Sequence, residues 1–390
     1  MEIKEAENSM LKYYCSKNIS PVHQDISDLC KHFSRREKLY RQCGVPAGFL
    51  QGKNVLEIGP GSGYNTLAFF QWGASKVDLV EPNSKGREDM LSLFAEHGID
   101  KECFEIFPLA FEEFANISHR RDYDFVVCEG FIQQAAGARD IFLELLNFPK
   151  PGGVMVWTCM DPQGLFVEYL KRVAALGMTC GVASEAQRED RLVEIFAPQL
   201  KKLFGVSRPP RDWVQDQILN PNGNGKDFFR LGEALDDLPE NFHLLGSSPQ
   251  LIRDISWYKD LRHPQKKDMM ADLKSRLATL LLAGSPEVCL AEADGEALEQ
   301  SIRSIMAYGQ HFEEQAALAD LVQIAIELQK MKNLASRVSE DFRLIIEEAA
   351  DCFAKLGHGE NIDFIPYPHW AGTFGRAMSY MAAQRDMEYA

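Results

Sequence analysis

Three glycines at alternate positions, flanked by two carboxylates, form the part of the sequence with the clearest capacity for chemistry. The stretch VLEIGPGSG contains Glu57, Gly59, Gly61 and Gly63, and a second apolar run ends at Glu81, 18 residues after the last glycine. Glycine allows a tight turn and a close approach of the backbone to a ligand, and the start of a following helix presents free N–H groups. A carboxylate after the second run can accept hydrogen bonds from both hydroxyls of a ribose. This pattern predicts a nucleotide-type ligand site.

The spacing of the glycines distinguishes between two classes of ligand that such a loop could bind. A dinucleotide-binding loop has the pattern GxGxxG, whose third glycine permits close packing of the helix over a pyrophosphate. This chain has GxGxG, with Tyr64 where that third glycine would stand. Glu57 lies just before the loop, where its charge would oppose a pyrophosphate but suit a cationic amine. A ligand with a ribose, a cationic amine and no phosphate is S-adenosylmethionine, which we therefore expect as the cofactor.

The elements that must position these residues alternate along the chain. Apolar runs typical of strands are separated by runs typical of helices, which is the pattern of βαβ units with a mostly parallel sheet and helices on both faces. The strand-like runs are residues 54–58, 76–82, 104–108, 123–130 and 154–160, and the helix-like runs are 65–73, 84–98, 111–117 and 139–148. A predicted turn, PKPGG, precedes the last of these strands.

A chain of 390 residues is too long for one compact core of ordinary size, so more than one domain is expected. Residues 1–52 favour a helical N-terminal segment that packs on the domain after it. Residues 53–264 form the expected sheet domain, with an insertion at about 180–240, and residues 265–390 a helical C-terminal module. Two strand-like runs, HLLGSSP and DISWYKD, could return to the sheet as its last two strands.

The composition disfavours several classes of partner. The net charge of −15 and the pI of about 5.2 disfavour binding to the phosphate backbone, so no DNA partner is expected. Nine scattered cysteines without a CxxC pair indicate reduced thiols in a cytoplasmic protein. The acidic start MEIKEAENSM is not a signal peptide, and the apolar run LATLLLAG is too short to span a bilayer. No metal site is expected.

Four motifs in order carry a family resemblance. VLEIGPGSG resembles the first motif of class I S-adenosylmethionine-dependent methyltransferases, and VDLVEPN resembles their second. YDFVVCEG is similar to their fourth strand, and PKPGGVMVW to their turn and fifth strand. The resemblance covers residues 50–160 and implies a Rossmann-like, doubly wound sheet of seven strands, with HLLGSSP and DISWYKD as strands six and seven. The insertion and the latter part of this domain also resemble, loosely, methyltransferases associated with bacterial surface-polysaccharide assembly.

The resemblance also implies roles for individual residues. The three glycines would approach the methionine part of the cofactor, Glu81 would hold its ribose, and Glu57 would hold the loop and the amino end. The expected cofactor-binding residues are Glu57, Gly59, Pro60, Gly61, Gly63, Glu81, Pro82, Ala110, Phe111, Glu129 and Gly130. The family often has an acidic residue after strand three that meets the adenine amine. This chain has Ala110 there, so the backbone of Ala110 and Phe111, or the side chain of Glu112, are the alternatives.

Methyl transfer needs a general base only when the acceptor is a hydroxyl or a protonated amine. Glu129, at the carboxyl end of the fourth strand, is the predicted candidate, because ligands bind at that end of such sheets. Its alternative role is to orient the cofactor or a loop. His243, His263 and His369 are further candidates, although each is more typical of a surface or interface histidine.

Two groups of cations could bind ligands. Arg35 or Arg36 could clasp the carboxylate of the cofactor, or could lie on a solvated face of a helix. Arg208, Arg211 and Trp213, in the insertion, could bind a polar or sugar-like acceptor, or could form a structural turn.

Three functions fit these observations. The first is methyl transfer to an O or N nucleophile of a small polar or saccharide acceptor. The second is a protein or RNA methyltransferase with the helical module as a docking element, and the third is a non-catalytic scaffold. Acidic charge disfavours RNA, and the glycines together with Glu81 disfavour a scaffold. The stretch CEGFIQQ also lacks the Asn/Asp-Pro-Pro-aromatic motif of enzymes that methylate nucleic-acid amines. The helical module could also make a homodimer.

Overall fold

The computed structural model describes residues 11–17, 19–20, 24–117, 123–203, 208–226, 228–253, 257–259 and 266–387. The chain forms two compact units. The sheet unit is drawn from Met1–Met160, Asp227–Met270 and Met378–Ala390, and the helical unit from Asp161–Lys226 and Ala271–Ala377. Both units are therefore discontinuous in sequence, which differs from the consecutive ranges 1–52, 53–264 and 265–390 expected above.

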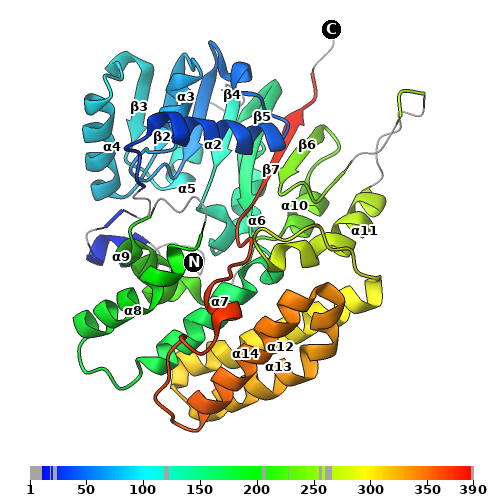
Figure 1. Ribbon diagram of the computed structural model, residues 1–390. Coiled ribbons are helices and arrows are strands. Elements are labelled where there is room, and N and C mark those ends of the chain that lie inside the picture. Colours follow the sequence, from blue (N-terminus) through cyan, green and yellow to red (C-terminus); the bar gives the residue numbers. More distant parts are fainter. Residues whose placement is uncertain are drawn as a thin grey trace. The chain divides into compact units, whose positions relative to one another are not determined.

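The sheet unit contains one sheet of seven strands in the order β3-β2-β1-β4-β5-β7-β6 (Figure 1). The strands are β1 (Asn54–Ile58), β2 (Lys76–Val80), β3 (Phe104–Phe107), β4 (Tyr123–Cys128), β5 (Pro149–Cys159), β6 (Phe242–Ser248) and β7 (Ser379–Arg385). Neighbours among β1 to β5 are parallel, and β7 is antiparallel to both β5 and β6. The predicted α/β, Rossmann-like, doubly wound fold with seven mostly parallel strands is confirmed.

The identity of the seventh strand was predicted incorrectly. Residues 243–248 of HLLGSSP do lie in β6, but the strand between β5 and β6 is Ser379–Arg385. In DISWYKD, the described residues 257–259 contribute no strand to this sheet, and the rest lies outside the described residues. The PKPGG turn is also part of β5, where the pairing with β4 is irregular between Tyr123 and Phe125.

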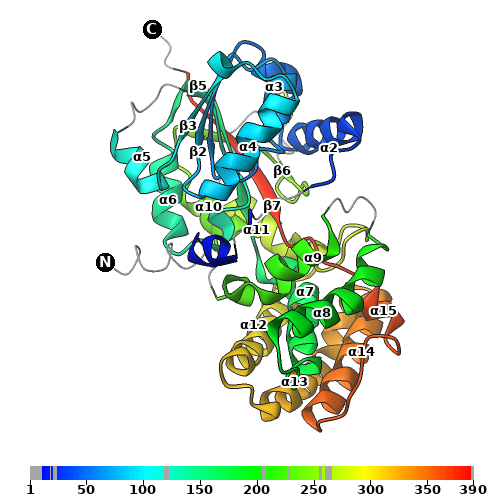
Figure 2. The same cartoon turned by 90° about the vertical axis from the view of Figure 1, so that its left-hand side faces the viewer.

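Helices cover both faces of the sheet (Figure 2). On one face lie α2 (Leu29–Gln42), α3 (Leu67–Gln71) and α4 (Ser84–Glu96), and on the other α5 (Phe111–Ile117), α6 (Ala138–Leu145) and α10 (Leu231–Asp237). Short helices connect them at η1 (Ala47–Leu50), η2 (Lys101–Cys103) and η3 (Ile132–Gln134). The predicted N-terminal helix is confirmed as α2, whose first turn is capped by the Asp28 side chain accepting from the Lys31 N–H.

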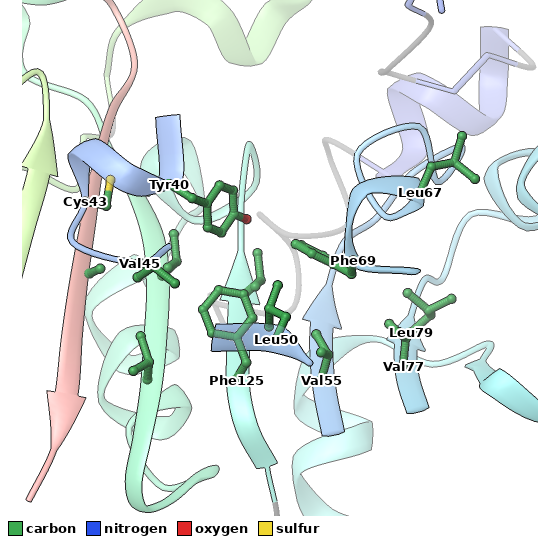
Figure 3. Packing of buried hydrophobic residues seen from close by; sticks show 14 of the residues in the cluster. Tyr40, Cys43, Val45, Leu50, Val55, Leu67, Phe69, Val77, Leu79 and Phe125 are labelled. Atoms are coloured by element: carbon green, nitrogen blue, oxygen red, sulfur yellow. The ribbon is translucent and has the colours of Figure 1, made fainter. Parts of the chain in front are cut away.

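The core of the sheet unit lies between the sheet and α2 and α3 (Figure 3). Tyr40, Phe69 and Phe125 are fully buried there, with ring centroids 5.9–6.0 Å apart. Tyr40 comes from α2, so the N-terminal helix is part of the core rather than an appendage. Such aromatic packing ties α2 to β4 beside the carboxyl ends of the central strands.

The helical unit is built around α7 (Pro162–Met178), of which 13 of 17 residues are buried. Its long partners are α12 (Glu292–Gln315), α13 (Leu318–Val338) and α14 (Glu340–Gly357). The other elements are α8 (Glu185–Leu200), α9 (Pro210–Trp213), η4 (Val214–Leu219), η5 (Pro221–Asn224), η6 (Leu277–Leu281) and α15 (Pro368–Ala371), and α11 (Lys266–Arg276) crosses the division between the units. None of the helices in the described ranges is both long and apolar enough to cross a bilayer.

A buried lysine fastens the end of α15 and the segment after it to α7. Lys171 Nζ donates a 3.2 Å hydrogen bond to the Ala371 carbonyl, and it lies 3.8 Å from the centroid of the Phe374 ring. Glu168, one turn earlier on α7, accepts a 3.0 Å hydrogen bond from the Gly375 N–H. Burial lowers the pKa of Lys171 to about 7 and raises that of Glu168 to about 7, and the opposite charge of each residue opposes the shift of the other.

Candidate functional site at the carboxyl ends of β1, β2 and β4

The loop between β1 and α3 depends on glycine. Gly59, Gly61 and Gly63 have φ of +70°, +58° and +77°, a region that other residues rarely adopt. A Cβ on Gly63 would also lie 2.7 Å from Met90 Cγ of α4. Gly63 is therefore required both by its backbone conformation and by the packing of α4 on the loop.

A fourth glycine of this region was missed by the sequence analysis. A Cβ on Gly86, in the first turn of α4, would lie 3.1 Å from the Gly61 carbonyl oxygen and 3.5 Å from Glu81 Cδ. The glycine lets α4 approach the loop and Glu81 closely. A glycine in the first turn of a predicted helix, in SKGRED, was the signal that could have indicated this contact.

Glu81 directly follows β2, and its side chain joins the loop between β1 and α3 to the loop after β2. Its carboxylate accepts 2.8 Å hydrogen bonds from the backbone N–H groups of Gly61 and Asn83. The residue is 6% exposed, and burial raises its pKa, although these two hydrogen bonds oppose the shift. A carboxylate offers about four acceptor positions, so two backbone donors leave capacity for a ligand's hydroxyls. The neighbouring Pro82 carbonyl accepts a 2.7 Å hydrogen bond from Arg87.

Glu57 is buried within β1, beside the ends of its neighbours β2 and β4. The hydroxyl of Thr66 and Glu57 Oε2 are 2.6 Å apart. Burial raises the pKa of Glu57 to about 8; the hydrogen bond from Thr66 opposes this rise, and the charge of Glu129 adds to it. Glu57 therefore holds a proton at neutral pH in the free protein. Thr66 was not identified from the sequence.

Glu129, the predicted base, is engaged by two donors from α2. Arg36 Nη2 lies 2.6 Å and 2.7 Å from its two carboxylate oxygens, and the hydroxyl of Tyr40 donates to one of them. The side chains of Arg36 and Glu129 are 8% and 6% exposed. Burial alone would lower the pKa of Arg36, but Glu129 raises it well above the ordinary value. This arrangement suits the orienting role that was the alternative for Glu129.

The loop after β4 is held by side chains of β5 and η3. Gly130 has a φ of +74°, and its N–H donates a 3.0 Å hydrogen bond to the hydroxyl of Thr158. That hydroxyl donates a 2.6 Å hydrogen bond to Gln133 Oε1. A Cβ on Gly59 would lie 3.5 Å from Phe131 Cβ, so the loops after β1 and β4 are in contact range. The loop that carries Gly130 is thus rigidly placed beside the glycine loop.

The residues that could meet the adenine end of the expected cofactor differ in the hydrogen bonds that they already make. The Ala110 N–H donates a 3.0 Å hydrogen bond to the carboxylate of Glu113, so this group is already used. Phe111 is buried and its ring packs near Phe148. Among the described residues, the buried Oε1 of Glu112 has no hydrogen-bond partner. Glu112 therefore keeps an acceptor available for an amine, and the assignment of this end stays a prediction.

The three residues predicted to bind the acceptor lie in the helical unit. Trp213 is 8% exposed and packs between Phe196 and Phe374, with ring centroids 5.0 Å and 6.2 Å away. Arg211 is paired with carboxylates of α8, with Asp190 2.6 Å away, and Arg208 is 2.8 Å from Asp216. These contacts correspond to the structural alternative. A role in acceptor binding stays a prediction.

Two of the candidate histidines lie outside the group of residues at the sheet edge. His243 of β6 is exposed and pairs with Asp386, and His369 is an exposed residue of α15 in the helical unit. His263 lies outside the described residues. In the described ranges, no group of three or more histidine, cysteine or carboxylate side chains is arranged to hold a metal ion.

The sequence matches no protein-family model and no curated protein. A solved structure from Galdieria sulphuraria, provisionally described as a sarcosine dimethylglycine methyltransferase, is 11% identical, with 92% of this chain and 86% of that chain covered and a TM-score of 0.36. An S-adenosylmethionine-dependent methyltransferase from Mesorhizobium loti is 14% identical, with 30% and 50% covered and a TM-score of 0.25. A protein from Listeria monocytogenes, provisionally described as such a methyltransferase, is 17% identical, with 33% and 57% covered and a TM-score of 0.27.

These solved structures are described as methyltransferases that use S-adenosylmethionine. The chain spans about half the length of the second and third of them.

Proposed function

We propose that the protein binds S-adenosylmethionine at the carboxyl ends of β1, β2 and β4 and transfers its methyl group to an O or N nucleophile of a small polar or saccharide acceptor. The observation that carries this proposal is an excess of buried carboxyl groups. Glu57, Glu81 and the side chain of Glu129 are each at most 6% exposed, whereas one buried arginine, Arg36, is paired with Glu129. Buried carboxyl groups without a matching cation favour a cationic ligand and disfavour a pyrophosphate.

The residues at this edge suit the parts of that cofactor. Glu81 keeps acceptor capacity for the hydroxyls of a ribose, beside a loop whose glycines let the backbone come close. Glu57 would lose its proton when a cationic amine approaches, because a nearby positive charge lowers the pKa of a carboxyl group. When bound, S-adenosylmethionine supplies an electrophilic methyl group on a positively charged sulfur.

The chain's contribution to the reaction is mainly binding and orientation. Holding an acceptor in line with an activated group accounts for much of the acceleration in such reactions. Glu129 is held by Arg36 and Tyr40, so it orients the loop of Gly130 rather than accepting a proton from the acceptor. An acceptor whose lone pair is already nucleophilic, such as a neutral amine, therefore fits this site better than a hydroxyl, which needs a base to remove its proton.

Calorimetry tests the cofactor. The full chain should bind S-adenosylmethionine and S-adenosylhomocysteine in the micromolar range and should not bind NAD. Binding of NAD without binding of S-adenosylmethionine would overturn the proposal.

Transfer of a labelled methyl group into fractionated cell extract tests the acceptor. The loose resemblance to surface-polysaccharide enzymes makes saccharide fractions the first to examine. Label in protein or RNA fractions would favour the docking alternative, and no label anywhere despite cofactor binding would favour a scaffold. The nine free cysteines support the proposed cytoplasmic location, and a homodimer stays a prediction that sedimentation can test.

A further inference from the structure

Phe131 lies at the point where the order of the sheet reverses. From β1 the chain builds outward through β2 and β3, and it then returns to add β4 on the other side of β1. In open α/β sheets, ligands bind beyond the carboxyl ends of the strands at such a point. Gly59 directly follows β1, and a Cβ built on it would lie 3.5 Å from Cβ and 3.9 Å from Cγ of Phe131. The side chain of Phe131 therefore begins against the loop after β1.

The backbone on both sides of Phe131 is held by hydrogen bonds. The Gly130 N–H, just before it, donates to the Thr158 hydroxyl, and the side chain of Gln133, two residues after it, accepts from that hydroxyl. The backbone carbonyl of Gln133 also accepts a 3.0 Å hydrogen bond from the Phe229 N–H. The backbone that carries the ring is thus fixed in the free protein, so a ligand that contacts the ring loses little affinity to its ordering.

The ring of Phe131 is half-buried. Across the described residues, the structure assigns it no contact with another aromatic ring and no cation over its face. By contrast, Phe111, after β3, and Phe142, in α6, lie 6.1 Å and 5.1 Å from the centroids of neighbouring rings. Phe131 therefore has a ring that is available to a ligand at this edge of the sheet.

The charges around this ring favour a cation. The buried carboxyl groups of Glu57 and Glu129 lie two residues before Gly59 and Phe131, and Arg36, the buried arginine of this edge, is already paired with Glu129. The face of a phenyl ring carries partial negative charge and attracts a cation. A sulfonium has no N–H or O–H to donate, so the face of a ring suits it better than a hydrogen-bond acceptor does.

The chemistry of the expected cofactor brings its sulfur to the same place. The sulfur is bonded both to the methylene of the ribose and to the amino-acid chain. The contacts proposed above hold the ribose at Glu81, after β2, and the amine at Glu57, in β1. The sulfur between them would therefore lie along the loop after β1, where Gly59 meets Phe131.

We propose that the ring of Phe131 contacts the positively charged sulfur of S-adenosylmethionine, and that the site thereby distinguishes this cofactor from its neutral product, S-adenosylhomocysteine. Phe131 is in this role a specificity-determining residue. Because it binds the charged form more tightly, it favours the exchange of product for fresh cofactor. The inference rests on the proposed function and adds the recognition of charge to it.

Calorimetry on the full chain with three ligands tests this inference. S-adenosylmethionine carries a charge on its sulfur, sinefungin carries one on an amine at the same place, and S-adenosylhomocysteine carries none there. Phe131→Leu keeps an apolar side chain without a ring, so the dissociation constants of the two charged ligands should rise by about 3- to 30-fold, the range of cation–ring contacts. That of S-adenosylhomocysteine should stay nearly unchanged. Phe131→Tyr keeps the ring and should bind all three ligands as the wild type does.

Phe49→Leu is the matched control. Phe49 is also a half-buried phenylalanine of the sheet unit, but it lies in η1, before the amino end of β1. Its ring already has a cation, since Lys53 Nζ is 5.8 Å from the ring centroid. This variant should leave all three dissociation constants unchanged.

Fluorinated phenylalanines at position 131 give a second test if Phe131→Leu does not fold. One, two or three fluorines keep the shape of the ring and progressively remove the negative charge of its face. The affinity for S-adenosylmethionine should then fall stepwise, and that for S-adenosylhomocysteine should not follow.

An equal loss for charged and neutral ligands, or no loss in folded variants, would overturn the inference and leave the proposed function intact. If the wild-type chain binds none of the three ligands, the proposed function is wrong and the inference fails with it.

Discussion

The hydroxyl of Thr66 lies 2.6 Å from Glu57 Oε2, and this is the one hydrogen bond that the structure assigns to the Glu57 carboxyl group among the described residues. One neutral donor is too little to keep a buried carboxylate ionised, and the pKa of Glu57 rises to about 8 because of its burial. The proton on Glu57 consequently links stability to pH.

We expect the free energy of unfolding to fall as pH rises from about 4.5 to 8. In this window the folded state keeps the proton of Glu57 and the unfolded state has lost it, so the slope from this group is about −1.4 kcal/mol per pH unit. Glu57→Gln removes the slope and keeps an acceptor for Thr66. Urea denaturation at several pH values measures this slope for the wild type and the variant. Parallel plots of the free energy of unfolding against pH would contradict the assignment.

Glu81→Ala should weaken the binding of S-adenosylmethionine by roughly 1.5–3 kcal/mol, the range for hydrogen bonds to a charged group. It also leaves the Gly61 and Asn83 N–H groups without their acceptor, so some thermal stability should be lost. The control is Glu105→Ala, an exposed carboxylate of β3 that pairs with Lys76. An unchanged dissociation constant in a folded Glu81→Ala would remove this residue from the site.

Two glycine substitutions separate backbone strain from packing. Gly63 and Gly98 have similar φ values of +77° and +67°, but a Cβ on Gly98 meets nothing within 4 Å. Gly98→Ala should therefore cost only the conformational term of about 1–2 kcal/mol. Gly63→Ala should cost about 1–3 kcal/mol more, because the new Cβ clashes with Met90. Equal losses in denaturant titrations would show that α4 does not press on the loop.

The buried pair of Lys171 and Glu168 in the helical unit should respond differently to single and to double substitution. Lys171→Met removes the buried amine beside Glu168 together with its hydrogen bond to the Ala371 carbonyl, and should cost about 3–5 kcal/mol at pH 7. The cost should shrink toward pH 5, because Glu168, whose pKa is raised to about 7, then takes up a proton. Lys171→Met combined with Glu168→Gln should recover part of the loss at pH 7. A loss that does not depend on pH would indicate that packing, and not charge, fastens the segment after α15.

Strand β7 should be indispensable for the sheet. A chain that ends at Ala377 lacks β7 and leaves the facing edges of β5 and β6 without partners. It should be recovered mainly as aggregate, whereas a chain that ends at Met387 keeps the whole strand and should fold. Soluble yield and circular dichroism distinguish the two. A soluble, cooperatively unfolding chain ending at Ala377 would contradict this role.

The βαβ half of the sheet was predictable because its signals are local. Each strand from β1 to β5 is an apolar run. Each is followed by a stretch whose apolar residues recur at helical spacing, and by residues that end a helix. β7 gives no such signal, since SYMAAQR mixes small and polar residues and its partners lie far away in the sequence. Its strand structure comes from pairing with β5 and β6, which no local pattern encodes.

The site was predictable in part for a similar reason. The glycines, Glu57 and Glu81 follow from spacing along one continuous stretch. The pairing of Arg36 with Glu129 spans 93 residues, and each partner alone suggested a different role. Thr66 and Tyr40 were missed because a threonine near a glycine loop and a tyrosine in an amphipathic helix have no distinctive sequence pattern.

The position of β7 has a consequence for synthesis on the ribosome. Cys159 at the end of β5 pairs with Ser379, 220 positions later. At ~5–20 residues per second, roughly 10–45 s pass between the emergence of these two partners. Throughout that interval the nascent chain carries an open β5 edge, and β6, once it has been made, lacks its neighbour β7. Newly made chains of this protein should therefore depend on chaperones more than their final fold suggests.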